Sequence, residues 1–346
     1  MAKDILYNKK NKTDLLNDLK KEKFKRITLS FYRYINLENL TSLRDVIYKE
    51  WSNLNILGRV YIADEGVNAQ ISIPKNKLIK FRKHIDSIEQ FKNIPFKIAI
   101  EEGISFLKLT VKVKKEIVAY NISKDQYNMN KVGNHLDYKD FNKALDDGAI
   151  VVDMRNYYEG EVGKFENAII PDVEKSNDLL PEIKKILSQN KKDKIIMYCT
   201  GGIRCEKASS YLLKQGFKDV SQLKGGIIQY ANDIQKNNVQ SKFIGKNFVF
   251  DQRLGERITQ DIISTCHICN NSCDTHTNCA NQDCHILFIQ CNKCKNKFNS
   301  CCSEKCKKFI SLPRSEQQQL FKSGKIKFNS QKSSKIKPKL YEINNY

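Results

Sequence analysis

The stretch that decides the fold runs from Tyr198 to Ala208 and reads YCTGGIRCEKA. It follows an apolar run that predicts a buried strand, and it leads into a helical pattern. The two glycines let the backbone curl tightly around Cys199. Such a turn directs successive N–H groups and a helix N-terminus at the sulfur, which favours a thiolate and binds an anion. Arg204 adds a positive charge, so we predict that Cys199 is a reactive cysteine rather than a structural one.

The segments around this loop alternate between short apolar strands and helices. Strands are predicted over 149–153, 194–198 and 220–223, and helices over about 138–145, 177–188, 203–215 and 226–235. Short apolar strands separated by helices indicate a parallel sheet covered on both faces. We therefore assign residues 127–240 to a parallel α/β domain.

The preceding segment, residues 27–120, follows a different pattern. Strands are predicted over 27–34, 59–63, 68–73, 96–100 and 107–113, and helices over about 40–54 and 78–91. This order is the ferredoxin-like βαββαβ motif. Residues 1–26 are polar and rich in lysine, which predicts a basic N-terminal arm. The chain is thus expected to be an α/β multidomain protein.

The ferredoxin-like domain also carries candidate RNA-binding residues. They are Tyr32, Arg33, Tyr34, Arg59 and Tyr61. Aromatic side chains on a sheet can stack on unpaired bases, and arginine can contact phosphates. Because side chains alternate along a strand, Tyr32 and Tyr34 share one face and Arg33 lies on the other, so part of this set must face the helices.

Cysteines dominate the C-terminal part, since ten of the 12 lie between Cys266 and Cys306. This density, with no visible secretion signal, indicates metal ligation in a reducing cytosol rather than disulfides. Two C-x2-C pairs predict a tetrahedral zinc site with four sulfur ligands, Cys266, Cys269, Cys291 and Cys294. Candidates for a second site are Cys273, Cys279, Cys284, Cys301, Cys302, Cys306, His267, His276 and His285. We interpret residues 241–310 as a small module with structural zinc, and an iron–sulfur cluster is the alternative.

Charge and hydropathy narrow the class of protein. Lys and Arg number 60 against 39 Asp and Glu, a formal net charge of +21, which favours a polyanionic partner such as nucleic acid. Residues 311–346 are basic and poor in apolar side chains, which predicts a flexible tail. No apolar run approaches the roughly 18–20 residues of a membrane span, so we expect a cytoplasmic protein without a membrane partner.

Several motifs of the α/β domain resemble the rhodanese family. They are Val151–Arg155 with Glu159, Gly163–Ala168, the loop Cys199–Arg204, and Leu223–Ile227 with Tyr230. Lys164 stands where that family usually has histidine. The loop has six residues, the length that the resemblance associates with sulfurtransferases, whereas the related phosphatases use seven. The resemblance implies a rhodanese-like fold over residues 127–240.

Residues 25–310 as a whole are similar to the rhodanese-like tRNA uridine hydroxylases. The further segments that carry this likeness are 65–68, 248–253, 273–279, 288–291 and 301–306. The resemblance implies an O2-dependent enzyme that converts the wobble uridine, position 34 of tRNA, to 5-hydroxyuridine, with the anticodon stem-loop as its binding partner. It places Cys199 in the catalytic position, the loop residues Thr200, Gly201, Gly202, Ile203 and Arg204 around it, and Asp153 and Arg155 in support.

The chemistry at Cys199 leaves alternatives open. A thiolate or a persulfide on Cys199 would add to the uracil ring or deliver activated oxygen, and no flavin or haem motif is visible, so O2 would act with an unidentified reductant. A sulfurtransferase that carries persulfide on Cys199 is the alternative enzyme. A zinc-bearing RNA-binding protein with a vestigial rhodanese domain is the alternative that is not an enzyme. Cys205 either resolves an oxidised Cys199 or packs against the sheet.

Overall fold

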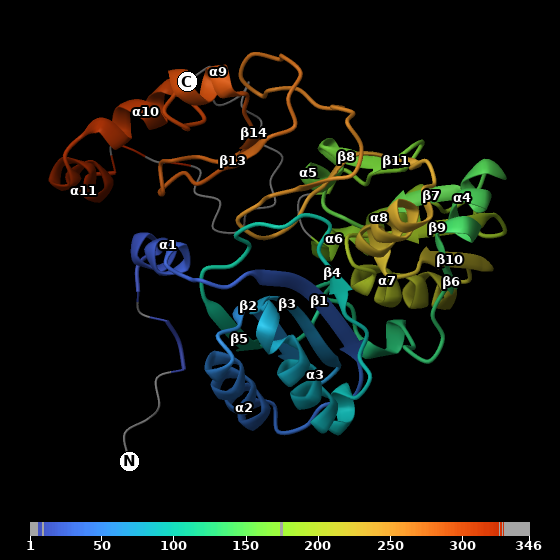
Figure 1. Ribbon diagram of the computed structural model, residues 1–346. Helices are drawn as coiled ribbons and strands as arrows, with labels where there is room; N and C mark the ends of the chain where they lie inside the picture. Colours follow the sequence, from blue (N-terminus) through green and yellow to red (C-terminus); the bar gives the residue numbers. More distant parts are fainter. Residues whose placement is uncertain (1–5, 9, 174–175, 325, 327, 329–346) are drawn as a thin grey trace.

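The computed structural model describes residues 6–8, 10–173, 176–324, 326 and 328. Figure 1 shows three parts, an N-terminal sheet with its helices, a central α/β part and a C-terminal cysteine-rich part. In the described ranges, no helix has both the length and the apolar character that a membrane crossing requires.

The N-terminal part is built on a five-stranded sheet of order β4-β1-β3-β2-β5. Its strands are β1 (Arg26–Tyr34), β2 (Leu57–Ala63), β3 (Gly66–Pro74), β4 (Lys97–Ile98) and β5 (Leu109–Val113). Its helices are α1 (Lys12–Lys20), α2 (Leu40–Asn53) and α3 (Leu78–Ser87). The first four strands have the order of the predicted ferredoxin-like motif, and β5 extends the sheet by pairing parallel to β2.

The two faces of this sheet differ in chemistry. Helices α2 and α3 cover one face, where Phe31, Trp51 and Phe81 pack with ring centroids 5.2–6.2 Å apart. The other face is polar and lines a cavity toward the central part, with the side chains of Thr28, Ser30, Tyr32, Arg59, Tyr61, Asn68 and Gln70. The alternation of apolar and polar residues along the strands therefore leaves one face of the domain available to a ligand.

The central part contains a parallel sheet of order β6-β10-β9-β7. Its strands are β6 (Asn134–Leu136), β7 (Ile150–Asp153), β9 (Lys194–Tyr198) and β10 (Asp219–Leu223). Its helices are α4 (Tyr138–Asp146), α5 (Tyr157–Glu161), α6 (Ser176–Ile186), α7 (Ile203–Lys214) and α8 (Gly226–Asn237). Side chains from α6 and α7 pack on one face and side chains from α4 and α8 on the other, as predicted for a buried parallel sheet.

A small antiparallel sheet extends the central part beyond its predicted end at residue 240. Strand β11 (Phe243–Asn247) pairs with β8 (Gly163–Phe165) and with β12 (Glu256–Arg257). Phe243 lies in the same hydrophobic core as Phe165 and Tyr198. Phe248, Phe250 and Leu254 instead pack in a cluster with Cys266 and Cys273, so the segment after β11 connects the α/β core to the cysteine-rich part.

The cysteine-rich part has little regular structure. It contains β13 (His276–Asn278), β14 (Leu287–Ile289), α9 (Asn292–Lys297), α10 (Glu304–Ser311) and α11 (Arg314–Lys322). The tail expected to be flexible from residue 311 onward is thus helical over α11, and its residues 329–346 lie outside the described residues. The Asp274 carboxylate joins this part to the small sheet, since it accepts a hydrogen bond from Lys246 at 2.9 Å and forms an ion pair with Arg257.

A buried ion cluster joins the N-terminal part to α7. The Lys207 ammonium lies 2.9 Å from a Glu65 oxygen and 2.7 Å from a Glu116 oxygen, and its side chain is fully buried. Its Nζ also lies 4.8 Å from the centre of the Tyr127 ring. Because Glu65 and Glu116 belong to the N-terminal part, separating the two parts would leave these charges unpaired.

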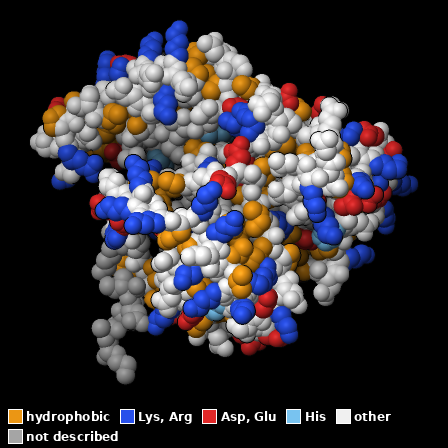
Figure 2. Space-filling model, viewed as in Figure 1, with side chains coloured by type: hydrophobic (Ala, Val, Ile, Leu, Met, Phe, Trp, Pro, Cys, Tyr) orange, Lys and Arg blue, Asp and Glu red, His pale blue; other side chains and the backbone are white. Residues whose placement is uncertain are grey.

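Lysine and arginine side chains are distributed over all three parts on the face seen in Figure 2. They do not form one continuous stripe, and hydrophobic side chains lie between them near the centre of this face. On this face, lysine and arginine side chains are thus not confined to one part of the chain.

Candidate active site

The loop after β9 wraps its backbone around the sulfur of Cys199. The Gly202 N–H donates to Sγ at 3.1 Å, and Gly202 has a φ of +96°, which favours glycine. The carbonyls of Cys199 and Thr200 accept hydrogen bonds from Ile227 and Ile228 in the first turn of α8, at 2.9 and 3.1 Å. The glycine pair predicted to shape this turn is therefore fixed between the starts of α7 and α8.

The neighbours of Cys199 favour its thiolate. Burial alone would raise the pKa of this thiol, but contact with the Cys205 thiol, the charge of Arg204 and backbone N–H groups of α7 bring the pKa down to about 6. The same contact and burial raise the pKa of Cys205 well above its ordinary value. Cys199 is thus the group that ionises, and Cys205 stays protonated as its neighbour in the core beneath α7.

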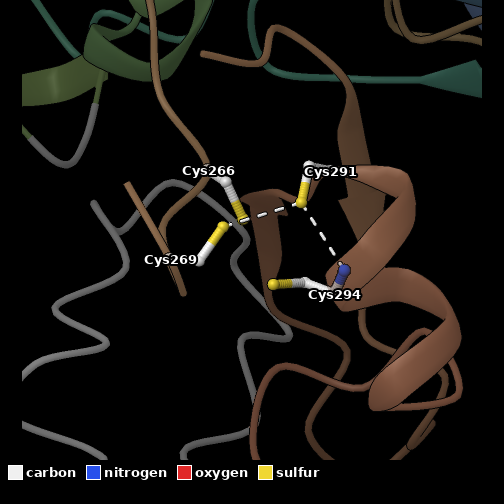
Figure 3. A group of neighbouring side chains, drawn as sticks. All are labelled: Cys266, Cys269, Cys291 and Cys294. Atoms are coloured by element: carbon white, nitrogen blue, oxygen red, sulfur yellow. Dashed lines mark hydrogen bonds between the residues drawn. The ribbon is translucent and has the colours of Figure 1, made fainter. Parts of the chain in front are cut away.

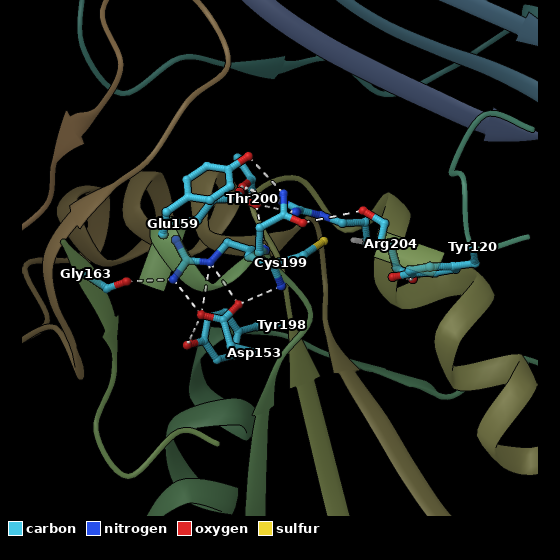
Figure 4. Close-up of polar contacts among 12 residues, drawn as sticks. Tyr120, Asp153, Glu159, Gly163, Tyr198, Cys199, Thr200 and Arg204 are labelled. Atoms are coloured by element: carbon cyan, nitrogen blue, oxygen red, sulfur yellow. Dashed lines mark hydrogen bonds and ion pairs between the residues drawn. The ribbon is translucent and has the colours of Figure 1, made fainter. Parts of the chain in front are cut away.

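Arg204 is held by a carboxylate that lies beneath the loop. Its guanidinium donates to both oxygens of Glu159, at 2.7 and 3.0 Å, and to the Thr200 hydroxyl at 3.0 Å (Figure 4). Glu159 lies in α5, where it also accepts the Asn156 N–H at 2.8 Å. The side chain of Glu159 is completely buried, and the nearby arginines lower its pKa although burial opposes this. This residue fixes the position of Arg204.

Asp153 and Arg155 support the strand below the loop. Arg155 donates to the Asp153 carboxylate at 2.7 Å and to the Gly163 carbonyl at 2.6 Å, and the Tyr198 hydroxyl donates to the same carboxylate at 2.7 Å (Figure 4). All of these side chains lie under the sheet end, away from the cavity described next. They are therefore placed to hold β7, β8 and β9 together.

A cavity of about 410 Å³ lies between the loop and the polar face of the N-terminal sheet. Its central-part wall includes Thr200, Gly201, Ile203 and Arg204. A third wall comes from the segment after β11, with Phe250 and its neighbours. The size falls within the roughly 300–1,000 Å³ of small-molecule sites. Cys199 itself lies beneath the wall and is 0% exposed.

The predicted RNA-binding residues divide between the two faces of the sheet. Tyr32, Arg59 and Tyr61 line the cavity. The Tyr34 hydroxyl donates to the Ile203 carbonyl at 3.3 Å, so it joins the two parts. Arg33 points to the helix-covered face, where its guanidinium donates to the carbonyls of Gln90 and Lys92. Arg33 therefore does not line the cavity, and RNA binding by Arg33 stays a prediction.

Two groups of four cysteines can each hold a metal ion. The first is Cys266, Cys269, Cys291 and Cys294, the set that the C-x2-C spacing predicts (Figure 3). The Sγ atoms of Cys269 and Cys291 lie 3.7 Å apart. Four sulfurs at roughly 2.3 Å from a tetrahedral zinc are about 3.8 Å apart, so this donor set fits zinc.

The second group is Cys279, Cys284, Cys302 and Cys306. Sγ of Cys302 lies 3.7 Å from Sγ of both Cys284 and Cys306, which again fits a tetrahedral ion.

The other candidates for the second metal site lie outside both groups. They are Cys273, Cys301, His267, His276 and His285. The His267 ring lies 3.1 Å from a Glu161 oxygen and so contacts α5. His276 is buried with its ring centroid 4.9 Å from that of Phe248, and His285 is exposed. The sequence could not exclude them, because spacing alone does not show which side chains converge.

Comparison with known proteins assigns the family. Family models match at residues 26–117 (UPF0176 acylphosphatase like domain), 137–233 (Rhodanese-like domain) and 244–307 (Rhodanase C-terminal). A protein of Leptospira interrogans named tRNA uridine(34) hydroxylase is 50% identical over 341 residues, 98% of this chain and 93% of its own. The chain belongs to the tRNA uridine(34) hydroxylase family.

Other members of the tRNA uridine(34) hydroxylase family match over nearly the same length. One from Enterobacter sp. (strain 638) is 46% identical over 316 residues, 90% of each chain. Among solved structures, a rhodanese-like domain from Anabaena sp. aligns with 32% of this chain and 78% of its own, at 20% identity and a TM-score of 0.26.

Two residues of the site were not predicted from the sequence. Glu159 was noticed only as part of a rhodanese-like motif, and its buried pairing with Arg204 had no signal of its own. Lys97, a cavity residue from β4, gave no signal at all. Lys97 lies in a strand of only two residues, and lysine is common throughout the chain, so no sequence pattern distinguishes it.

Proposed function

We propose that this protein hydroxylates C5 of uridine 34 in tRNA and so forms 5-hydroxyuridine. Membership of a family whose members are named for this reaction supports the proposal. The observation that carries it is the Cys199 loop with its low-pKa thiol beneath a cavity of nucleotide size. In the cell, the reaction takes place in the cytoplasm, where tRNA is modified.

The overall reaction takes O2 as co-substrate. One oxygen atom enters the C5–H bond, and the other leaves as water after it takes up two electrons and two protons. A reductant outside this chain supplies those electrons. Uracil C5 becomes electron-rich once a nucleophile adds to C6, so sulfur on Cys199 prepares the carbon that receives oxygen.

The reacting sulfur is the Cys199 thiolate or a persulfide on it. Because Sγ lies beneath the cavity wall, a thiolate requires the loop to move before it can reach a base. A persulfide extends about 2 Å further, the length of one S–S bond. The backbone N–H groups of the loop and Arg204 stabilise the negative sulfur in either form.

The substrate enters as a single unpaired nucleotide of the anticodon stem-loop. A base that stays stacked cannot present its C5–C6 edge to a buried sulfur, so it must swing out of the loop. Tyr32 and Tyr61 offer aromatic rings, and Arg59 a cation, on the opposite wall of the cavity. The net charge of +21 favours association with the phosphates of the tRNA.

Structural zinc occupies the cysteine-rich part in this proposal. The ions stabilise a segment whose buried clusters consist largely of the cysteines themselves, and they take no part in the reaction. The sulfur ligands are the two groups of four cysteines described above.

The test is nucleoside mass spectrometry of tRNA from a strain that lacks the gene. Its tRNA should lack 5-hydroxyuridine derivatives that depend on this enzyme, and the intact gene should restore them only in the presence of O2. A gene encoding Cys199→Ser should restore none. Full 5-hydroxyuridine content in the deletion strain, with no second pathway present, would contradict the proposal.

A sulfurtransferase is the second candidate, because the six-residue loop of Cys199 is typical of rhodanese sulfurtransferases. It transfers the outer sulfur of a Cys199 persulfide to an acceptor. Purified protein incubated with thiosulfate and cyanide distinguishes the two. Rapid thiocyanate formation without any change in tRNA would favour the sulfurtransferase.

A further inference from the structure

Lys97 is a buried lysine that lines the cavity beside the active-site loop. It comes from β4, where it stands opposite Ser30 of β1 and so faces the cavity. Its exposed fraction is only 8%. In the described part of the chain, its Nζ has no hydrogen-bond acceptor and no carboxylate within ion-pair distance. Because Lys97 lines the cavity, a ligand bound there can supply the acceptor that the neighbouring side chains do not.

The lysine lies against the wall that covers Cys199. Its Nζ is 4.3 Å from the centre of the Tyr32 ring, and the Tyr32 hydroxyl donates to Glu206 in α7 at 3.0 Å. A Cβ on Gly225 would lie 3.3 Å from Cε of Lys97, so the lysine stem passes over the glycine turn that packs on the loop. Lys97 therefore crosses from the N-terminal part to the active-site loop.

Electrostatics agree with this placement. Burial lowers the pKa of Lys97 to about 8, while the negative charges of Cys199 and Glu206 act in the opposite direction. Tyr32, the other titratable side chain in contact, stays neutral because burial raises its pKa well above the ordinary value. Near neutral pH the amine is thus mostly protonated and can donate hydrogen bonds to a ligand.

We propose that Lys97 is a catalytic residue that donates a hydrogen bond to the O4 carbonyl oxygen of the target uracil. This inference rests on the proposed function. When sulfur on Cys199 forms a bond to C6, the C5–C6 π electrons move through C4 onto O4 and give an enolate. The ammonium of Lys97 stabilises that negative charge, as donors in an oxyanion hole do.

The enolate predicts a reaction that needs no oxidant. C5 of the adduct takes a proton from water. This carbon then carries two hydrogens, the original one and the one from solvent. Loss of either hydrogen as a proton re-forms the C5–C6 π bond and expels sulfur from C6. Uracil is regenerated, and its original C5 hydrogen exchanges with solvent in the absence of O2.

The experiment follows this exchange in an anticodon stem-loop that carries deuterium at C5 of uridine 34. The full-length protein is incubated with it in ordinary water without O2, and mass spectrometry measures the loss of deuterium. Lys97→Met keeps the length of the stem and removes the charge. It should slow both exchange and aerobic hydroxylation by about 100-fold in kcat, the effect of losing one charge-stabilising donor.

Two further variants complete the comparison. Lys97→Arg retains a cation and should recover at least a tenth of the wild-type rate. Lys83→Met, an exposed lysine of α3 on the far side of the sheet, should behave like the wild type. Should Lys97→Met prove insoluble, Lys97→Gln carries the same expectation.

The outcomes separate the inference from the proposed function. A folded Lys97→Met protein with wild-type kcat overturns the inference, and so does a rise in KM alone, which would make Lys97 only a binding residue. Wild-type hydroxylation without any anaerobic exchange also overturns it and leaves the proposed function intact. Absence of hydroxylation in the wild type defeats the proposed function itself.

Discussion

Replacing Glu159 with glutamine should destabilise the protein by about 3 kcal/mol. Glutamine has the same shape as glutamate but carries no charge and replaces one acceptor oxygen with an NH2 group. Both oxygens of Glu159 accept hydrogen bonds, one from Asn156 and Arg204 and the other from Arg204. In either orientation the new NH2 group would therefore face a donor.

The magnitude follows from the burial of the pair. Removing one partner of a buried ion pair costs roughly 3–5 kcal/mol, because the other charge remains without compensation. Arg204 retains 15% exposure, so water can solvate part of its charge and the lower end of that range applies. With a urea dependence of about 2 kcal/mol per molar, the unfolding midpoint should fall by about 1.5 M.

The assay is urea unfolding followed by circular dichroism at 222 nm. Glu182→Gln is the matched control, because its ion pair with Lys185 is long, at 3.8 Å, and lies on the surface. This control should change stability by less than about 0.5 kcal/mol. Arg204→Met combined with Glu159→Gln should cost less than the sum of the single changes. A Glu159→Gln midpoint within about 0.3 M of the wild type, or strictly additive effects, would refute the reasoning.

Three further predictions concern the site and the metal groups. Cys199→Ser should abolish 5-hydroxyuridine formation, measured by mass spectrometry, and change stability by no more than about 1 kcal/mol, since serine is similar in size. The rate in the wild type should rise as the pH increases through about 6, because the thiolate is the reactive form, and a rate that is flat from pH 5 to 8 would contradict this. The purified protein should be colourless with two zinc ions per chain, and chelation should unfold the cysteine-rich part first. Cys266→Ser should lose one zinc while Cys273→Ser keeps both, and a brown protein with iron and sulfide would contradict the metal assignment.

Most of the fold could be predicted from the sequence, because the patterns that indicate its helices and strands lie within short segments. Alternation along β1 and the glycines around Cys199 could be read directly from neighbouring residues. The C-x2-C pairs likewise gave one complete group of four cysteines, since each pair supplies two ligands from one turn. These features need no knowledge of how distant segments meet.

The features that the sequence did not predict depend on contacts between segments that are far apart in the chain. The second cysteine group draws Cys279, Cys284, Cys302 and Cys306 from segments with irregular spacing, so six cysteines and three histidines remained equal candidates. The role of Lys97 arises only because the N-terminal sheet turns its polar face toward the loop of another part. For the same reason, strand alternation separated Arg33 from Tyr32 but could not show which of the two faces the cavity.

The Lys207 cluster has a consequence for how this chain can change during evolution. Its lysine comes from the helix that follows the reactive loop, and its two glutamates come from the part before it. A rhodanese-type unit without a lysine at this position would leave the two glutamates without a counter-ion in a largely buried interface. An exchange of the central part for another unit of its fold would therefore have to retain this lysine, or replace both glutamates at the same time.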